Sequence, residues 1–134
     1  MAKHHDGLIY TMVLVSAADS NMTDAELLTI GEMVRVLPVF DGYDEATLPA
    51  TTEACAELLA EEDGLDRVID FVKGAVGDKL AETAYALACD VVAADGEANQ
   101  EELRLLEIIR HRLDIDRLIA AGIERGSRAR HMTG

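Results

Sequence analysis

Two short acidic segments of this chain contain oxygen ligands at spacings that suit a hard cation. Asp19 and Glu26 are seven positions apart in the first segment, and Asp95 and Glu102 are seven positions apart in the second. Glu97 adds a further carboxylate at an alternate position of the second segment. Divalent cations such as Ca²⁺ and Mg²⁺ take carboxylate and other oxygen ligands. The spacing therefore predicts a cation-binding turn in each segment.

The two segments are copies of one pattern. Residues 15–31 are VSAADSNMTDAELLTIG and residues 91–107 are VVAADGEANQEELRLLE. At a constant offset of 76 residues, six of the seventeen aligned positions are identical. Each copy has Ala-Ala-Asp, a short polar stretch and then a Glu. This pattern predicts an internal duplication in which one helix ends, the chain turns and a second helix begins.

The same acids also have a purely structural explanation. Glu26 follows Thr23 by three residues, and Glu102 follows Asn99 by three residues, which is the spacing of a capping box at a helix N-terminus. The aspartates of the turns can accept backbone N–H bonds. Neither segment matches an EF-hand, and neither has His or Cys at the spacing of a structural zinc site. Cation binding and helix capping both remain open on the sequence alone.

Asp90 is a carboxylate inside the apolar stretch 84–94, where its counterpart in the first copy is Leu14. A carboxylate on a buried helix needs a partner, because an isolated buried charge is costly. Asp90 either extends the cation site of Asp95 or pairs with an Arg, and the Arg is the favoured partner.

Helical periodicity of apolar residues predicts an all-α fold, a compact bundle of about seven helices. Pro49 is expected to interrupt a helical turn, so that Thr51 or Thr52 caps the following helix. Asp114 is expected to cap the last helix. The stretch 78–94 is apolar on nearly every side, which predicts a central helix. The expected helices are 6–18, 23–37, 52–62, 65–76, 78–94, 99–113 and 115–127, with a helical turn at 44–48.

The composition limits the function classes. The 134 residues carry a net charge of −14 and form one expected domain, 1–134, with a core at about 6–124 and a basic tail at 125–134. An acidic field of this size repels nucleic acid and attracts cations or basic partners. No apolar run is long enough to span a membrane, so we expect no membrane insertion and a cytoplasmic location. No motif for catalysis or for an organic cofactor is present, and we expect no enzymatic activity.

The cysteines and histidines give no site of their own. Cys55 and Cys89 lie in helical, Ala-rich surroundings and are expected to be buried thiols, although the sequence does not exclude a disulfide. His4 and His5 lie near the N-terminus and are expected to be solvated. No pair of His residues has the spacing of a metal site.

The segments IYTMVLVSAADSNMTDAELLTI and ALACDVVAADGEANQEELRLLEIIRHRLDID resemble the TerB-like domains of bacterial tellurite-resistance operons. The resemblance covers about residues 8–123. It implies a compact helical domain with an internal duplication and without enzymatic activity, in which acidic residues bind a divalent metal. Transferred motif by motif, the ligand positions are Asp19, Glu26, Asp95 and Glu102. The first copy departs from the pattern, with Ser20 where the second has Gly96.

The resemblance also implies a role in tellurite resistance and the response to chemical stress, together with other stress-response proteins as partners. Our leading hypothesis is a divalent-cation-binding domain of such a system, with Ca²⁺ or Mg²⁺ favoured. The alternative is a metal-free protein-interaction scaffold whose acidic face binds a basic partner. The sequence leaves the oligomeric state open.

Overall fold

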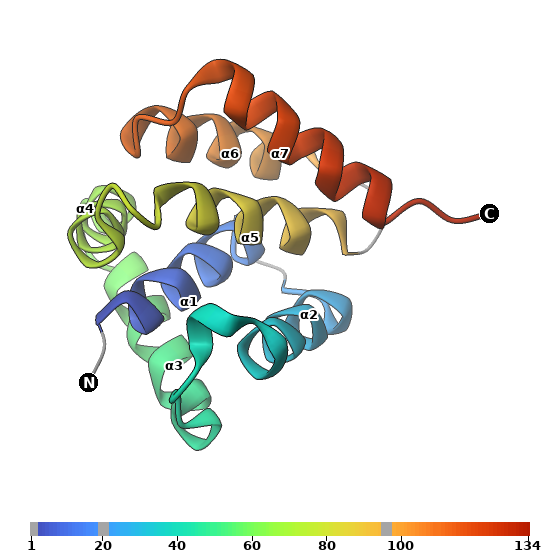
Figure 1. Cartoon of the computed structure of the whole chain (residues 1–134). Coiled ribbons are helices and arrows are strands. Elements are labelled where there is room, and N and C mark those ends of the chain that lie inside the picture. The colour runs from blue at the N-terminus through green and yellow to red at the C-terminus, as the bar shows by residue number, and fades with distance from the viewer. Residues whose placement is uncertain (1–2, 19–21, 95–97) are drawn as a thin grey trace.

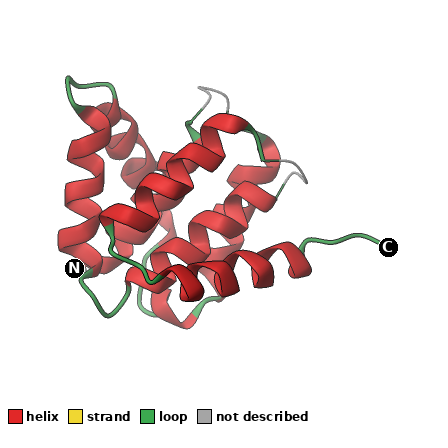
Figure 2. Cartoon of the chain, turned by 90° about the horizontal axis from the view of Figure 1, so that it is seen from above, coloured by secondary structure: helices red, strands yellow, loops and turns green. Residues whose placement is uncertain are grey.

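The computed structural model describes residues 3–18, 22–94 and 98–134, and within these ranges the chain forms seven α-helices, two short 3-10 helices and no strand. The expected all-α fold with seven helices is therefore confirmed. Figure 2 shows short connections between the helices. None of the helices in these ranges has the length and hydropathy needed to cross a membrane. The elements are α1 (Lys3–Ser16), α2 (Asp24–Val36), η1 (Pro38–Phe40), η2 (Glu45–Thr47), α3 (Leu48–Leu59), α4 (Gly64–Val76), α5 (Ala81–Ala93), α6 (Gln100–Arg112) and α7 (Arg117–Arg130).

Two helices, α1 and α5, share the centre of the molecule. In α1 the side chains of Leu8, Met12 and Val15 are completely buried, and in α5 those of Ala88 and Val91 are completely buried. The two helices pack against each other and run in the same direction, as Figure 1 shows. The sequence predicted only the second of them as the central helix. Burial on nearly every side is the reason that both sequences are apolar nearly all round.

The predicted duplication is present at the level of secondary structure. Helices α2 and α6 each contain 13 residues, and both ends of α6 lie 76 positions beyond those of α2. Both helices begin with a complete capping box, formed by Thr23 with Glu26 in α2 and by Asn99 with Glu102 in α6. Because the first N–H groups of a helix have no partner within it, these side chains supply the missing acceptors.

The start of α3 differs from the sequence prediction. The helix begins at Leu48, so Pro49 lies in its first turn instead of interrupting it, and Thr51 and Thr52 are inside the helix. Proline is well tolerated in this position because its missing N–H would have no partner in the helix and its fixed φ suits the α conformation.

The start of α7 also differs. Asp116, and not Asp114, caps the helix, with Oδ2 accepting from the backbone N–H of Leu118 at 3.0 Å and of Ile119 at 3.2 Å. Asp114 adopts a left-handed conformation (φ 58°) just after α6. This residue therefore ends one helix instead of starting the next, which aspartate does more readily than most residues.

The expectation that His5 is solvated is wrong. His5 is 7% exposed, and its Nε2–H donates to the carbonyl oxygen of Val39 at 3.0 Å. Its ring stacks on Phe40 at a centroid distance of 5.7 Å and meets the edge of Tyr43 at 5.4 Å. Because the partners lie more than thirty residues away in the chain, local sequence gave no indication of this contact.

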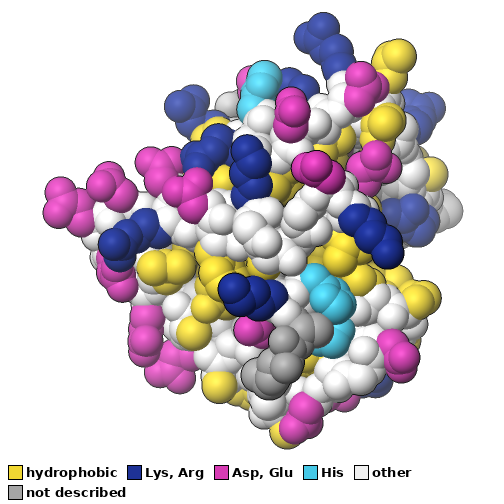
Figure 3. Space-filling view, turned by 60° about the vertical axis from the view of Figure 1, so that its left-hand side comes forward, with side chains coloured by type: hydrophobic (Ala, Val, Ile, Leu, Met, Phe, Trp, Pro, Cys, Tyr) yellow, Lys and Arg dark blue, Asp and Glu magenta, His cyan; other side chains and the backbone are white. Residues whose placement is uncertain are grey.

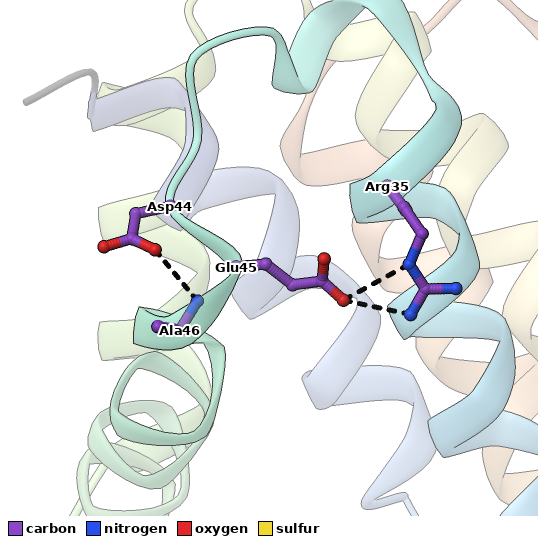
Figure 4. A network of polar contacts seen from close by, with 4 residues as sticks. All are labelled: Arg35, Asp44, Glu45 and Ala46. Carbon is purple, nitrogen blue, oxygen red and sulfur yellow. Dashed lines mark hydrogen bonds and ion pairs between the residues drawn. The ribbon is translucent and has the colours of Figure 1, made fainter.

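An ion pair and a capping hydrogen bond stabilise the connection between α2 and α3. Arg35 of α2 donates to Oε1 of Glu45 from both Nε and Nη2, at 3.3 and 2.9 Å. The adjacent Asp44 accepts from the backbone N–H of Ala46 at 3.0 Å, which caps η2 (Figure 4). Both members of the ion pair are about half exposed, so the pair contributes at most about 1 kcal/mol to stability.

The two cysteines are free, buried thiols, as expected. Burial raises the pKa of Cys55 to about 12, and burial together with the nearby Glu124 carboxylate raises that of Cys89 to about 12. Both thiols therefore stay protonated and unreactive at neutral pH.

Candidate cation-binding turns

Each of the two acidic turns follows one of the two central helices in the chain. Helices α1 and α5 lie side by side and both run from left to right in Figure 1, where α1 ends near the middle of the molecule and α5 ends further to the right. Each is followed in the chain by one of the predicted turns. Asp19, Asp95 and Glu97 lie outside the described residues. Glu26 and Glu102 are described, and each lies in the first turn of the helix that follows.

Glu26 is the most deeply buried carboxylate of the described residues, at 1% exposure. Its Oε1 accepts from the backbone N–H of Thr23 at 2.9 Å and from the Thr23 hydroxyl at 3.1 Å. Its Oε2 is also buried and has no hydrogen-bond partner among the described residues. A buried polar atom without a partner costs about 1–3 kcal/mol, and more when it carries charge. The capping box thus explains one oxygen of Glu26 and leaves the other available to a ligand.

Glu102 occupies the equivalent place and is 4% exposed. Its carboxylate accepts from the backbone N–H of Asn99 at 3.1 Å, and its own backbone N–H donates to Oδ1 of Asn99 at 2.8 Å. The N-terminus of a helix carries a partial positive charge, which stabilises an anionic side chain there. Capping and the helix dipole therefore favour a glutamate at the first turn of both helices.

The donor chemistry fits a hard cation, because each turn offers oxygen ligands and no described thiolate or imidazole. Within residues 3–18, 22–94 and 98–134, no group of three or more His, Cys, Asp or Glu side chains is placed to hold a metal ion. A complete ligand set would therefore need the turn residues Asp19, Asp95 and Glu97 in addition to the two glutamates. That part of the site remains a prediction.

Asp90 points to α7. Its Oδ1 accepts from Nη2 of Arg130 at 2.6 Å and from the hydroxyl of Ser127 at 2.8 Å. The side chain is only 9% exposed, so the ion pair is largely shielded from water on the aspartate side. The predicted pairing of Asp90 with an Arg is confirmed. A role as a cation ligand remains a prediction, since this carboxylate already has a cationic partner.

Sequence analysis missed a set of arginines that line a groove between α6 and α7, namely Arg110, Arg117 and Arg128. The uneven distribution of charge along the sequence could have indicated these arginines. Residues 104–134 hold seven Arg and four Asp or Glu, whereas residues 1–103 hold five Lys or Arg and 22 Asp or Glu. Figure 3 shows more Lys and Arg side chains in the upper part of the molecule, the level at which α6 and α7 lie, than below.

The fold and the site together define a class of protein, an all-helical domain with an internal duplication. In each copy, a helix is followed by a turn and by a second helix whose capping box contains a buried glutamate. The family model of tellurite resistance protein TerB matches residues 5–122. The chain belongs to this family, since the match covers most of its length. No curated protein and no solved structure matches the chain.

Proposed function

We propose that this domain is a non-enzymatic, cytoplasmic component of a tellurite-resistance or chemical-stress response and that it binds a divalent cation through its duplicated turns. The observation that carries the cation proposal is the buried Oε2 of Glu26, which lacks a hydrogen-bond partner among the described residues. A cation at this oxygen would balance a buried negative charge that otherwise destabilises the fold.

The proposed ligands are Glu26 with Asp19 in the first turn, and Glu102 with Asp95 and Glu97 in the second. Oxygen ligands of this kind favour Ca²⁺ or Mg²⁺ over Zn²⁺, which prefers Cys and His. Asp90 lies on α5 before the second turn and would act there only at the expense of its pair with Arg130. When bound, the cation would hold each turn on the helix that follows.

Thermal unfolding of the full chain tests this proposal. Chelator-treated protein is compared with protein in millimolar Ca²⁺, Mg²⁺, Mn²⁺ or Zn²⁺ at constant ionic strength. A cation that binds only the folded state stabilises it by about 2.7 kcal/mol at a concentration a hundred times its Kd. We expect Ca²⁺ or Mg²⁺ to raise the Tm and the paired substitution Asp95→Asn with Glu102→Gln to reduce the rise.

Glu26→Gln gives the sharpest result, because its two expected effects have opposite signs. In chelator the variant should be at least as stable as wild type, since the amide keeps the bond at Oε1 and removes a buried charge. In the presence of the cation it should be less stable than wild type, since a ligand is lost. Asp24→Asn, an exposed change of equal charge in the same helical turn, is the matched control and should shift neither comparison.

The alternative is a metal-free interaction scaffold, and it is favoured by the two complete capping boxes, which give each glutamate a structural role without a ligand. Under this alternative no cation raises the Tm. Glu26→Gln then has the same effect with and without cation. Either result contradicts the cation proposal.

A further inference from the structure

A groove lies between the last two helices of the fold. Helices α6 and α7 each pack against α5 rather than against each other, and the space between them has a volume of about 910 Å³. Its floor is apolar and contains Val92 of α5, Leu106 of α6 and Ala120 of α7. At its edges Leu103 is 51% exposed and Met132 is 67% exposed. The three floor residues are themselves nearly covered, at 4%, 8% and 1% exposure, so the open apolar surface of the groove lies at its edges.

The rim of the groove is basic and its charges are unpaired. Arg110 projects from α6, and Arg117 and Arg128 project from α7. None of the three has a carboxylate within ion-pair distance in the described part of the chain, and the guanidinium of Arg110 forms a hydrogen bond with the ring of His111 at 2.9 Å. The acids at the groove are Glu107 and Glu124.

The chain has more than twice as many acids as bases, yet the three arginines of the groove have no ion pair within the described residues. Arg35, Arg67, Arg112 and Arg130 each contact a carboxylate, whereas Arg104 and Arg125, like the three groove arginines, have no ion pair within the described residues. At the groove, Glu124 is bound to the buried hydroxyl of Tyr85 at 2.5 Å. The arginines of the rim can therefore form ion pairs with carboxylates of another molecule.

We propose that this groove binds an acidic, amphipathic helix of a partner protein. The apolar face of that helix would cover Leu103 and Met132 at the edges of the groove. Carboxylates beside this face would pair with Arg110, Arg117 and Arg128. The groove walls are helices, whose backbone groups bond internally, so they offer no edge to which an extended strand could add. A helix laid in an apolar groove between two helices is the recognition mode that fits these walls, and the arginines of the rim favour a partner helix with negative charge.

This inference is independent of cation binding. It also differs from the scaffold alternative, in which the acidic face of the domain binds a basic partner. Here the basic groove binds an acidic one.

Fluorescence anisotropy with a defined probe tests the proposal. The probe is a labelled synthetic helix of about 18 residues, with Leu at i, i+3, i+4 and i+7, Glu beside this apolar face and Gln opposite it. Two control peptides carry Lys in place of Glu, or the same residues in scrambled order. The full chain is titrated in chelator at about 0.05 M and about 0.3 M salt.

We expect saturable binding of the Glu peptide at one site, weakened by the higher salt. Charge reversal in Arg117→Glu with Arg128→Glu should weaken it at least about tenfold, because attraction becomes repulsion. Leu103→Asp should also weaken it. Arg125→Glu is the matched control, since Arg125 is exposed on the same helix but does not line the groove, and it should bind like wild type. Circular dichroism checks that each variant is folded.

Three outcomes would overturn the proposal. One is that the Glu peptide does not bind, or binds no better than the Lys or scrambled peptide. Another is that reversal of Arg117 and Arg128 leaves binding unchanged. The third is that vesicles containing an anionic phospholipid bind in an Arg117- and Arg128-dependent manner while the Glu peptide does not, which would assign the groove to a membrane surface.

Discussion

At the scale of single residues, three carboxylates of the described chain are buried, and each is stabilised differently. Glu102 caps a helix and Asp90 pairs with Arg130. Glu26 caps a helix with one oxygen and leaves the other without a hydrogen-bond partner in the described ranges. An unsatisfied buried carboxylate oxygen is the costliest of the three arrangements. Cation binding at Glu26 should therefore increase the free energy of unfolding more than binding at either of the other two carboxylates.

His5 supplies a pH-dependent prediction at this scale. Burial and the neighbouring His4 lower the pKa of His5 below its ordinary value of about 6.5. The unfolded chain therefore takes up this proton at a higher pH than the folded chain does. The contribution of His5 to stability is complete above pH 6.5 and is lost as the pH falls from there towards its folded pKa.

We expect the free energy of unfolding of wild type, measured by urea titration, to fall relative to that of His5→Gln as the pH drops from about 7 to about 5.5. Comparison with the variant cancels the titration of the many carboxylates. His111→Gln removes an exposed imidazole and should keep the pH dependence of wild type. An unchanged slope in His5→Gln would contradict the assignment.

At the scale of elements, α2 and α6 begin with the same type of N-terminal cap. Both N-cap residues, Thr23 and Asn99, have extended backbone conformations, and both accept from the backbone N–H three residues later. The caps differ in chemistry, since one is a hydroxyl and the other an amide, but they satisfy the same backbone groups. The role therefore requires a short side chain with an acceptor oxygen at this position of the repeat, and both residues provide one.

Removal of either cap should therefore destabilise the fold by a similar amount. We expect Thr23→Ala and Asn99→Ala each to lower the free energy of unfolding by about 0.5–2 kcal/mol. Thr23→Ser and Asn99→Asp keep an acceptor and should retain most of the stability. Urea titration in chelator measures all four variants. Alanine variants as stable as wild type would show that the capping boxes do not contribute.

At the scale of the whole molecule, the last helix binds the central one through a buried polar contact. Asp90 of α5 bonds to both Ser127 and Arg130 of α7, and one turn earlier in α5, Tyr85 bonds to Glu124. These contacts position α7 beside α5 and keep it apart from α6. The groove between α6 and α7 thus depends on how α7 is attached.

A double-mutant cycle measures this attachment. We expect Asp90→Asn and Arg130→Gln each to cost about 1–3 kcal/mol, because each leaves a hydrogen-bonded charge without its partner. The double variant should cost less than the sum, since the two side chains contact each other. Amide exchange in α7 should become faster in each single variant. Arg125→Gln, which removes an exposed and unpaired arginine, should change stability by less than about 0.5 kcal/mol. Strict additivity of the first two changes would contradict the contact.

The sequence alone determined the features that depend on local spacing. Period-3.6 apolar patterns predicted the seven helices, and the Thr-x-x-Glu and Asn-x-x-Glu spacings predicted both capping boxes, because capping involves residues within a single turn. The constant offset of 76 residues predicted the repeat. Local rules failed at the starts of two helices. Pro49 was expected to interrupt a helical turn but lies in the first turn of α3, and Asp116 caps α7 in place of Asp114.

The tertiary structure alone decided the contacts between residues distant in the chain. It placed α1 beside α5 at the centre of the molecule, and it identified Arg130 and Ser127 as the partners of Asp90. It buried His5 against Val39 and opened the arginine-lined groove. Such contacts depend on how the helices pack together. The sequence near a residue does not specify which distant side chain it will contact.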